Sequence, residues 1–181
     1  MEKLGFIHGR FQLFHNEHLK YALGAKEMCE KLIVGITSPE NTLLIHEDID
    51  PHRSTLSANP FTYYERYNMI KLALLEAGIS REDFELVPFP IERLDILSNY
   101  IPLWAASFLT IYDEWGYEKL KRLKSVGYKT IVLHDDKEKI LSSTDIRQMI
   151  AENREWKQMV PEAVYRYIID NNLTSKIKRM L

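Results

Sequence analysis

Apolar, strand-like stretches alternate along this chain with stretches of helical periodicity, and no other feature constrains its fold as strongly. The strand-like stretches cover residues 4–8, 31–37, 84–89, 108–112 and 129–134. Residues 31–37 read KLIVGIT, a β-rich and apolar pattern that is typical of a parallel strand covered on both faces. Strands that alternate with helices favour right-handed crossovers and a mainly parallel sheet. The sequence therefore predicts an α/β fold with a Rossmann-like, doubly wound parallel sheet of about five strands.

Helical periodicity connects these strands and continues toward the carboxyl end of the chain. We expect helices at about residues 16–29, 60–78, 117–125, 143–152 and 161–171. Asn59 would cap the second helix, with Pro60 in its first turn, and Gly127 would close the third. The C-terminal helices are followed by a basic tail that contains Lys176, Lys178 and Arg179.

The size and charge of the chain limit what it binds. Its 181 residues, of which 45% are hydrophobic, suit a single domain over residues 1–181. A net charge of -2 provides no global field that would attract nucleic acid or a membrane surface. Cys29 is the single cysteine, and no apolar run approaches the roughly 20 residues of a membrane span. We expect a cytoplasmic protein whose anion sites are local.

A histidine motif follows the first expected strand. Gly9 and Arg10 come directly after that strand, and His15 and His18 lie at the start of the first expected helix. Helix amides and a glycine turn favour bound phosphate, and histidines three residues apart can donate to one phosphorus. A lone histidine would more often cap a helix or lie at the surface, but this pair favours a phosphate site. No third ligand stands at a spacing typical of structural zinc.

A second cluster of polar residues precedes the fourth expected helix. Ser142, Ser143 and Thr144 supply three hydroxyls, and Arg147 follows one turn into the helix. These groups and the free helix amides suit a triphosphate. The alternative is an ordinary helix cap, with a serine bonded to the helix amides and Arg147 in solvent.

These two clusters carry a family resemblance that spans nearly the whole chain. Residues 9–18 (GRFQLFHNEH) resemble the GRFQPxHxGH signature of the HIGH-motif nucleotidylyltransferases, and residues 141–147 (LSSTDIR) resemble their ISSTxxR motif. The resemblance implies transfer of a nucleotidyl group to a phosphorylated substrate with loss of pyrophosphate, and magnesium bound through the triphosphate. The catalytic residues would be His15, His18, Arg10 and Arg147, and the nucleotide-binding residues Gly9, Phe11, Gln12, Ser142, Ser143 and Thr144.

A third element indicates the acceptor. Residues 59–66 (NPFTYYER) are similar to an element of archaeal-type nicotinamide mononucleotide adenylyltransferases, which implies ATP as donor and nicotinamide mononucleotide as acceptor. Candidate substrate contacts are Arg53, Asn99, Trp104 and Asp113. Arg53 lies in the stretch 38–59, which has no helical or strand periodicity, and connections of this length in compact domains are usually functional lids or mobile segments. A tryptophan such as Trp104 is more often part of a core, and Asp113 equally suits the entry of a helix.

Three positions depart from the family pattern. Leu13 replaces a proline, Glu17 replaces the glycine of HxGH, and Ala58 stands where the archaeal enzymes tend to have arginine. The Glu17 carboxylate would repel a phosphate unless it points away or pairs with a cation.

Two other functions remain open. One is a cytidylyltransferase that uses CTP and a phosphorylated alcohol or phosphonate, since the same motifs serve CTP chemistry. The other is a catalytically silent nucleotide-binding module, although both histidines are retained. A homo-oligomer is also compatible with the sequence.

Overall fold

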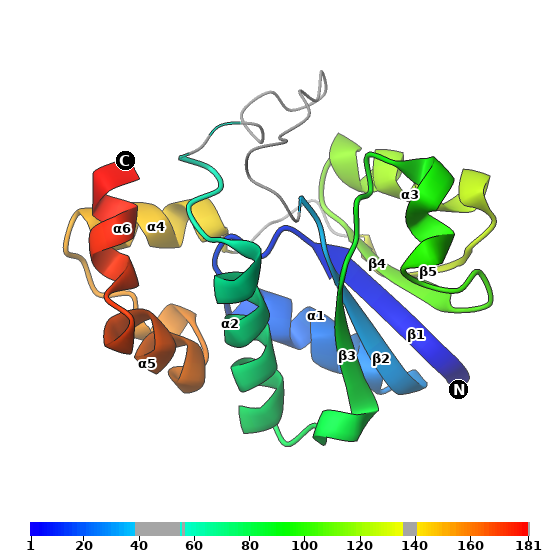
Figure 1. Ribbon diagram of the computed structural model, residues 1–181, viewed down its shortest axis with the longest axis horizontal. Coiled ribbons are helices and arrows are strands. Elements are labelled where there is room, and N and C mark those ends of the chain that lie inside the picture. The colour runs from blue at the N-terminus through cyan, green and yellow to red at the C-terminus, as the bar shows by residue number, and fades with distance from the viewer. Residues whose placement is uncertain (39–54, 56, 136–140, 181) are drawn as a thin grey trace. The chain divides into compact units, whose positions relative to one another are not determined.

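Five parallel strands form one sheet. A computed structural model describes residues 1–38, 55, 57–135 and 141–180 of the chain. The strand order is β3-β2-β1-β4-β5, with every pair parallel (Figure 1). The strands are β1 (Glu2–Gly9), β2 (Cys29–Ile36), β3 (Phe84–Pro88), β4 (Ala106–Ile111) and β5 (Lys129–Asp135). The expected doubly wound parallel sheet is therefore confirmed. Because the winding direction reverses between β1 and β4, the carboxyl ends of these strands are where such sheets bind ligands.

The helices connect the strands and complete the carboxyl end of the chain. The α-helices are α1 (Asn16–Lys26), α2 (Tyr63–Glu76), α3 (Glu114–Val126), α4 (Ser143–Ala151), α5 (Glu162–Asp170) and α6 (Leu173–Met180). Short 3-10 helices are η3 (Arg81–Asp83), η4 (Leu94–Asn99) and η5 (Lys157–Met159). None of the helices in this described part of the chain is both long and apolar enough to cross a membrane.

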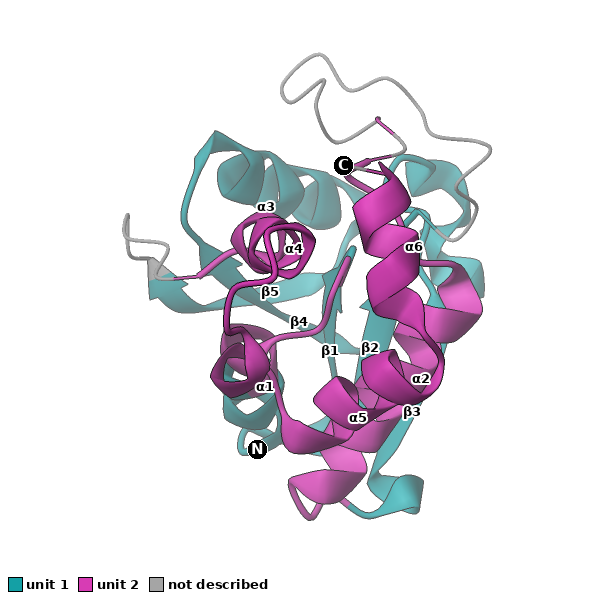
Figure 2. Cartoon of the chain, turned by 90° about the vertical axis from the view of Figure 1, so that its left-hand side faces the viewer, with its two compact units in different colours: residues 1–10, 20–39, 80–139 teal, residues 11–19, 40–79, 140–181 magenta. Residues whose placement is uncertain are grey.

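The chain divides into two compact units whose segments interleave in the sequence (Figure 2). Unit 1 comprises Met1–Arg10, Lys20–Pro39 and Ser80–Lys139, and it contains the whole sheet. Unit 2 comprises Phe11–Leu19, Glu40–Ile79 and Ile140–Leu181. The histidine motif, residues 9–18, therefore begins at the end of unit 1 and continues in unit 2. A single domain over residues 1–181 stays a prediction.

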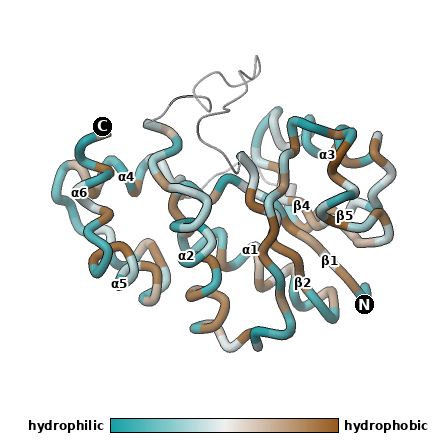
Figure 3. Tube along the Cα trace, in the orientation of Figure 1, coloured by the Kyte–Doolittle hydropathy of each residue, from teal (hydrophilic) through white to brown (hydrophobic). Residues whose placement is uncertain are grey.

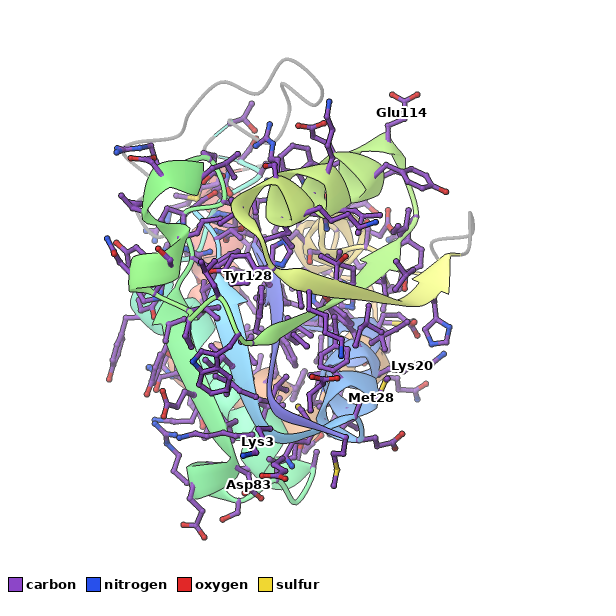
Figure 4. All side chains as sticks on the ribbon, turned by 90° about the vertical axis from the view of Figure 1, so that its right-hand side faces the viewer. Lys3, Lys20, Met28, Asp83, Glu114 and Tyr128 are labelled. Atoms are coloured by element: carbon purple, nitrogen blue, oxygen red, sulfur yellow. The ribbon has the colours of Figure 1, made fainter. Side chains whose placement is uncertain are left out.

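The core of unit 1 lies between one face of the sheet and the segments α3 and η4. Phe6 of β1 packs there against Tyr128, whose hydroxyl donates to the carbonyl oxygen of Ile101 at 2.7 Å. Figure 4 shows Tyr128 among these side chains, whereas Glu114 at the start of α3 points away from the core. Figure 3 shows the apolar character of β1 and β2, which agrees with strands covered on both faces.

Helix α2 begins later than the sequence suggested. Thr62 is its N-cap: the Thr62 side chain accepts from the amide of Glu65, and the Glu65 carboxylate accepts from the amide of Thr62. The expectation that Asn59 caps a helix with Pro60 in its first turn is therefore wrong. This reciprocal capping box satisfies two amides at once, which outweighs the preference of Pro60 for a first turn.

The carboxyl end of unit 2 forms a helix where we expected a basic tail. Leu173 and Ile177 are buried on one side of α6, four residues apart. On another side, the Lys176 ammonium contacts the Glu65 carboxylate at 2.7 Å and so ties α6 to α2. The cations of this segment obscured its apolar spacing, which is the spacing of an amphipathic helix.

Candidate nucleotide site

The two sequence motifs contact each other within unit 2. The Ser143 hydroxyl, at the start of α4, donates to the carbonyl oxygen of Leu13 at 2.9 Å. The Arg147 guanidinium donates from Nη1 to the carbonyl oxygen of Gln12 at 2.5 Å. Residues more than a hundred positions apart in the sequence therefore belong to one site, as a shared polyphosphate would require.

The two histidines of the motif form a stacked pair. Their ring centroids are 3.6 Å apart with an angle of 20° between the planes. The backbone amide of His15 donates to Nδ1 of His18 at 3.4 Å. Because Nδ1 of His18 accepts, a neutral His18 ring carries its proton on Nε2 and donates from that atom. His15 is only 2% exposed and directly precedes α1, at the positive end of the helix dipole.

Phenylalanines hold the His18 ring in place. The Phe11 ring lies edge-on to His18, with centroids 5.0 Å apart, and Phe14 lies 5.6 Å from the same ring. Phe11 has a left-handed backbone, with φ of 51°. Such a conformation costs on the order of 1–3 kcal/mol for a residue with a side chain. The sequence predicts Phe11 as a nucleotide contact; the structure places its buried ring against His18.

Gln12 joins the motif loop to the segment before α2. Its Nε2 donates to the carbonyl oxygen of Phe61 at 3.2 Å, and its Oε1 accepts from the amide of Phe61 at 2.9 Å. Both residues are buried. The sequence predicts a nucleotide contact for Gln12, whereas its carboxamide here binds backbone.

Replacing Gln12 by alanine is expected to destabilise the protein by about 2–4 kcal/mol, because the buried backbone of Phe61 loses two hydrogen bonds. Urea unfolding followed by circular dichroism measures this loss. Gln148→Ala is the matched control, since its exposed carboxamide donates to Glu152 on the surface of α4. Equal unfolding free energies for the two variants would contradict the assignment.

Arg147 is a buried cation. It is 3% exposed; besides Gln12, it donates from Nη2 to the Thr144 hydroxyl at 3.2 Å. Its buried Nε has no hydrogen-bond partner among the described residues, and no carboxylate in that part of the chain pairs with the guanidinium. Burial lowers the pKa of Arg147 to about 10, which still leaves it charged at neutral pH. A buried charge without a counter-charge favours the binding of an anion.

The hydroxyls before α4 also have structural partners. Ser142 is the N-cap, and its hydroxyl accepts from the amide of Asp145 at 3.1 Å. The capping alternative is thus correct for Ser142, but its companion expectation of a solvated Arg147 is wrong. The amides of Ser143 and Thr144 precede the capped amide, and amides at that place suit phosphate oxygens.

The other predicted residues of the motif loop lie where the units divide. Gly9 ends β1, and its carbonyl oxygen accepts from the amide of Thr37 at 2.9 Å. Arg10 follows it and is half-buried. Glu17, which stands where the family has glycine, lies in the first turn of α1, where the helix dipole favours a carboxylate.

Three of the four predicted acceptor contacts, Asn99, Trp104 and Asp113, belong to unit 1. Asn99 is exposed at the end of η4, and Trp104 is 67% exposed in the loop before β4, so it is not part of the core. Asp113 is the N-cap of α3 and accepts from the amide of Gly116 at 2.8 Å, as the helix-entry alternative expects. Arg53 lies outside the described residues.

Sequence reasoning missed one residue near the motif, His8. It is a buried histidine in the apolar run before Gly9, and its presence in such a run was the available signal. Among the described residues, no three His, Cys, Asp or Glu side chains gather in a way that could hold a metal ion.

Comparisons with known proteins show the family of this chain. Residues 6–149 match the model of the cytidylyltransferase-like family. Phosphonoformate cytidylyltransferase of Streptomyces viridochromogenes is 41% identical over 96% of this chain and 95% of that protein. Nicotinamide-nucleotide adenylyltransferase of Thermococcus sibiricus is 34% identical over 97% of this chain and 88% of that protein.

A solved structure shares the fold. It is a bifunctional NMN adenylyltransferase/ADP ribose pyrophosphatase of Francisella tularensis in complex with AMP and a Mn ion, with a TM-score of 0.66 at 19% identity. The match covers 99% of this chain and 52% of that one, so this chain spans about half of the solved chain. The family match and the two related sequences show that this chain belongs to the cytidylyltransferase-like family and is a nucleotidyltransferase.

Proposed function

We propose that this protein is a cytidylyltransferase that transfers CMP from CTP to a phosphonate, with phosphonoformate as the first candidate acceptor. The observation that carries the proposal is the 41% identity to phosphonoformate cytidylyltransferase over nearly the full length of both chains. The sequence motifs alone favoured an adenylyltransferase of nicotinamide mononucleotide, and the Thermococcus relative with that activity is 34% identical. We therefore prefer CTP and a phosphonate to ATP and nicotinamide mononucleotide.

The reaction is a direct in-line displacement. A phosphonate oxygen attacks the α-phosphorus of CTP and forms a new P–O bond, while the bond from the α-phosphorus to the bridging oxygen breaks. Pyrophosphate leaves with that electron pair, and no covalent enzyme intermediate forms. The protein supplies position and charge compensation, and residues 1–181 act as one catalytic domain.

Each motif has its own share of this task. His18 donates from Nε2 to the α-phosphate, and His15, stacked on it, faces the same phosphorus. Arg147 and the amides at the start of α4 hold the departing β- and γ-phosphates, and for Arg10 this role stays a prediction from the sequence. This division rests on the stacked imidazoles and on the buried, uncompensated guanidinium.

The donor set suits magnesium that arrives on the triphosphate. The groups gathered in unit 2 are imidazoles, a guanidinium and helix amides, which bind phosphate oxygens rather than a bare cation. Magnesium bound through the triphosphate would neutralise part of the charge on the triphosphate and on the pyrophosphate that leaves.

Pyrophosphate release from purified protein tests the proposal. We expect CTP with phosphonoformate to give a kcat/KM at least about a hundredfold above that of ATP with nicotinamide mononucleotide, because a site that hydrogen-bonds its substrate rejects analogues strongly. All four triphosphates should be assayed with both acceptors. Faster turnover of the ATP pair would overturn the proposal, and nucleotide binding without turnover of any pair would favour a silent binding module.

A further inference from the structure

Asn16 joins the first turn of α1 to a segment that is distant in the sequence. It is the first residue of α1, and its Nδ2 donates to the carbonyl oxygen of Gln158 in η5 at 2.8 Å. The two residues are 142 positions apart, and both belong to unit 2. Asn16 stands between the two histidines of the motif, at a position that the family signature leaves variable. Neither the motif nor the proposed mechanism gives this contact a role.

The segment that accepts this hydrogen bond is itself held in place. The Trp156 ring, at the N-cap of η5, packs against Tyr165 of α5 with centroids 4.9 Å apart. The Lys157 ammonium lies 5.1 Å from the centroid of the same Tyr165 ring and pairs with the Glu162 carboxylate at 3.3 Å. Both Trp156 and Lys157 directly precede Gln158, so η5 presents the Gln158 carbonyl oxygen from a fixed place on α5.

The turn that begins with Asn16 also carries the imidazole pair, His15 and His18. The amide of Leu19 donates to the carbonyl oxygen of His15 at 3.0 Å and closes the first turn of α1. The amide of His15 donates to Nδ1 of His18, and the two rings stack. Successive residues of an α-helix are rotated by about 100°, so a side chain fixed at Asn16 fixes the rotation of this turn about the helix axis. The contact with η5 therefore sets the orientation of the imidazole pair.

This support differs from that of the phenylalanines. Phe11 and Phe14 contact the His18 ring itself, whereas Asn16 anchors the backbone that carries both imidazoles. The hydrogen bond of Asn16 lies at the surface, and such a bond contributes little to the stability of a fold. A catalytic group that is displaced by about 1 Å can nevertheless lose about a hundredfold in rate. The contact should therefore matter more for the reaction than for folding.

We propose that Asn16 is a positioning residue for nucleotidyl transfer: its hydrogen bond to η5 holds the first turn of α1 so that the imidazole pair meets the α-phosphate. The consequence for rate rests on the proposed function. The structural part, that Asn16 holds the turn, does not. Asn16 contacts neither substrate in this assignment, so it acts on turnover and leaves substrate binding unchanged.

Replacing Asn16 by alanine separates positioning from folding and from substrate binding. The variant should lower kcat for CTP and phosphonoformate by about tenfold, since the displacement is smaller than 1 Å. The KM for either substrate should stay within about twofold of wild type, and the melting temperature should change by less than about 2 °C. Asn16→Gln keeps a carboxamide donor on a side chain one methylene longer and should recover part of kcat.

Asn171→Ala is the matched control. The Asn171 carboxamide is also exposed and also donates to a backbone carbonyl oxygen at 2.8 Å, that of Tyr167 within α5. This variant should keep wild-type kcat and KM. Pyrophosphate release under steady-state conditions compares the three variants with wild type.

Amide hydrogen exchange followed by NMR tests the structural part without any substrate. In Asn16→Ala, the amides of His15 and Leu19 should exchange about tenfold faster than in wild type, because the first turn of α1 opens more often. In Asn171→Ala they should exchange as in wild type.

The outcomes for Asn16 and for the proposed function are distinguishable. Wild-type protein without turnover of CTP and phosphonoformate would refute the cytidylyltransferase, and the exchange comparison would still decide whether Asn16 holds the imidazole pair. Equal exchange of the His15 and Leu19 amides in Asn16→Ala and Asn171→Ala would overturn the positioning role. In an active enzyme, an unchanged kcat of Asn16→Ala, or a raised KM alone, would overturn it as well.

Discussion

His18→Ala is expected to lower the turnover of CTP and phosphonoformate by about a hundredfold or more, with little change in the KM for either substrate. In the proposed mechanism, Nε2 of His18 donates to the α-phosphate as its negative charge shifts in the transition state. The stacked His15 and the rings of Phe11 and Phe14 contact the imidazole and fix its orientation. Pyrophosphate release under saturating substrate measures the effect.

Conservative variants of His18 distinguish donation from scaffolding. The carboxamide nitrogen of His18→Gln approximates Nε2 and should retain part of the turnover. The carboxamide oxygen of His18→Asn approximates Nδ1 and should keep the contact from the amide of His15 while turnover falls. His134→Ala removes an exposed imidazole from β5 and serves as the control. Wild-type turnover of His18→Ala would exclude the assigned role.

Arg147→Met is expected to lower kcat/KM for CTP by about a hundredfold while changing the free energy of unfolding by less than about 1 kcal/mol. The guanidinium is buried, and no carboxylate of the described residues compensates its charge. Methionine, which has a similar length, removes two hydrogen bonds but also removes the electrostatic cost of the buried charge, so the two effects on stability largely cancel. Its effect on activity and its effect on stability therefore diverge, unlike those of an ordinary core mutation.

Steady-state assays combined with urea unfolding measure both quantities. Arg147→Lys keeps the charge but loses the planar fork, and we expect an intermediate kcat/KM. Arg154→Met, which removes an exposed cation, is the control. Undiminished affinity for CTP in Arg147→Met would show that the buried charge does not face the triphosphate.

The sheet was predictable because its strands are short, apolar and separated by helical periodicity. Observed strand bounds depart from the expected ones by at most two residues at either end. The beginning of α2 and the existence of α6 were not predictable in the same way. Each depends on contacts of Glu65, with Thr62 in the capping box and with Lys176 in the ion pair, and the second of these joins distant residues.

The residue types of the candidate site were predictable from the sequence, but the contacts of the individual residues were not. The motifs identify imidazoles, hydroxyls and a guanidinium near phosphate. They do not indicate that Gln12 binds the backbone of Phe61, because that partner is 49 residues away. Nor does a pattern tell whether a buried histidine such as His8 has a partner, which depends on every neighbour in the folded unit. The choice between CTP and ATP came from relatedness over the whole chain rather than from the motifs.

The left-handed backbone of Phe11 affects how well the His18 imidazole is oriented for catalysis. Glycine would adopt its left-handed conformation at no steric cost, so an aromatic residue there is tolerated for what its ring does. That ring lies edge-on to His18 and fixes the plane of the imidazole. In the proposed reaction, the His18 ring then needs little rearrangement to reach the transition state. The conformational cost of the Phe11 φ angle is thereby offset by an imidazole that is already oriented.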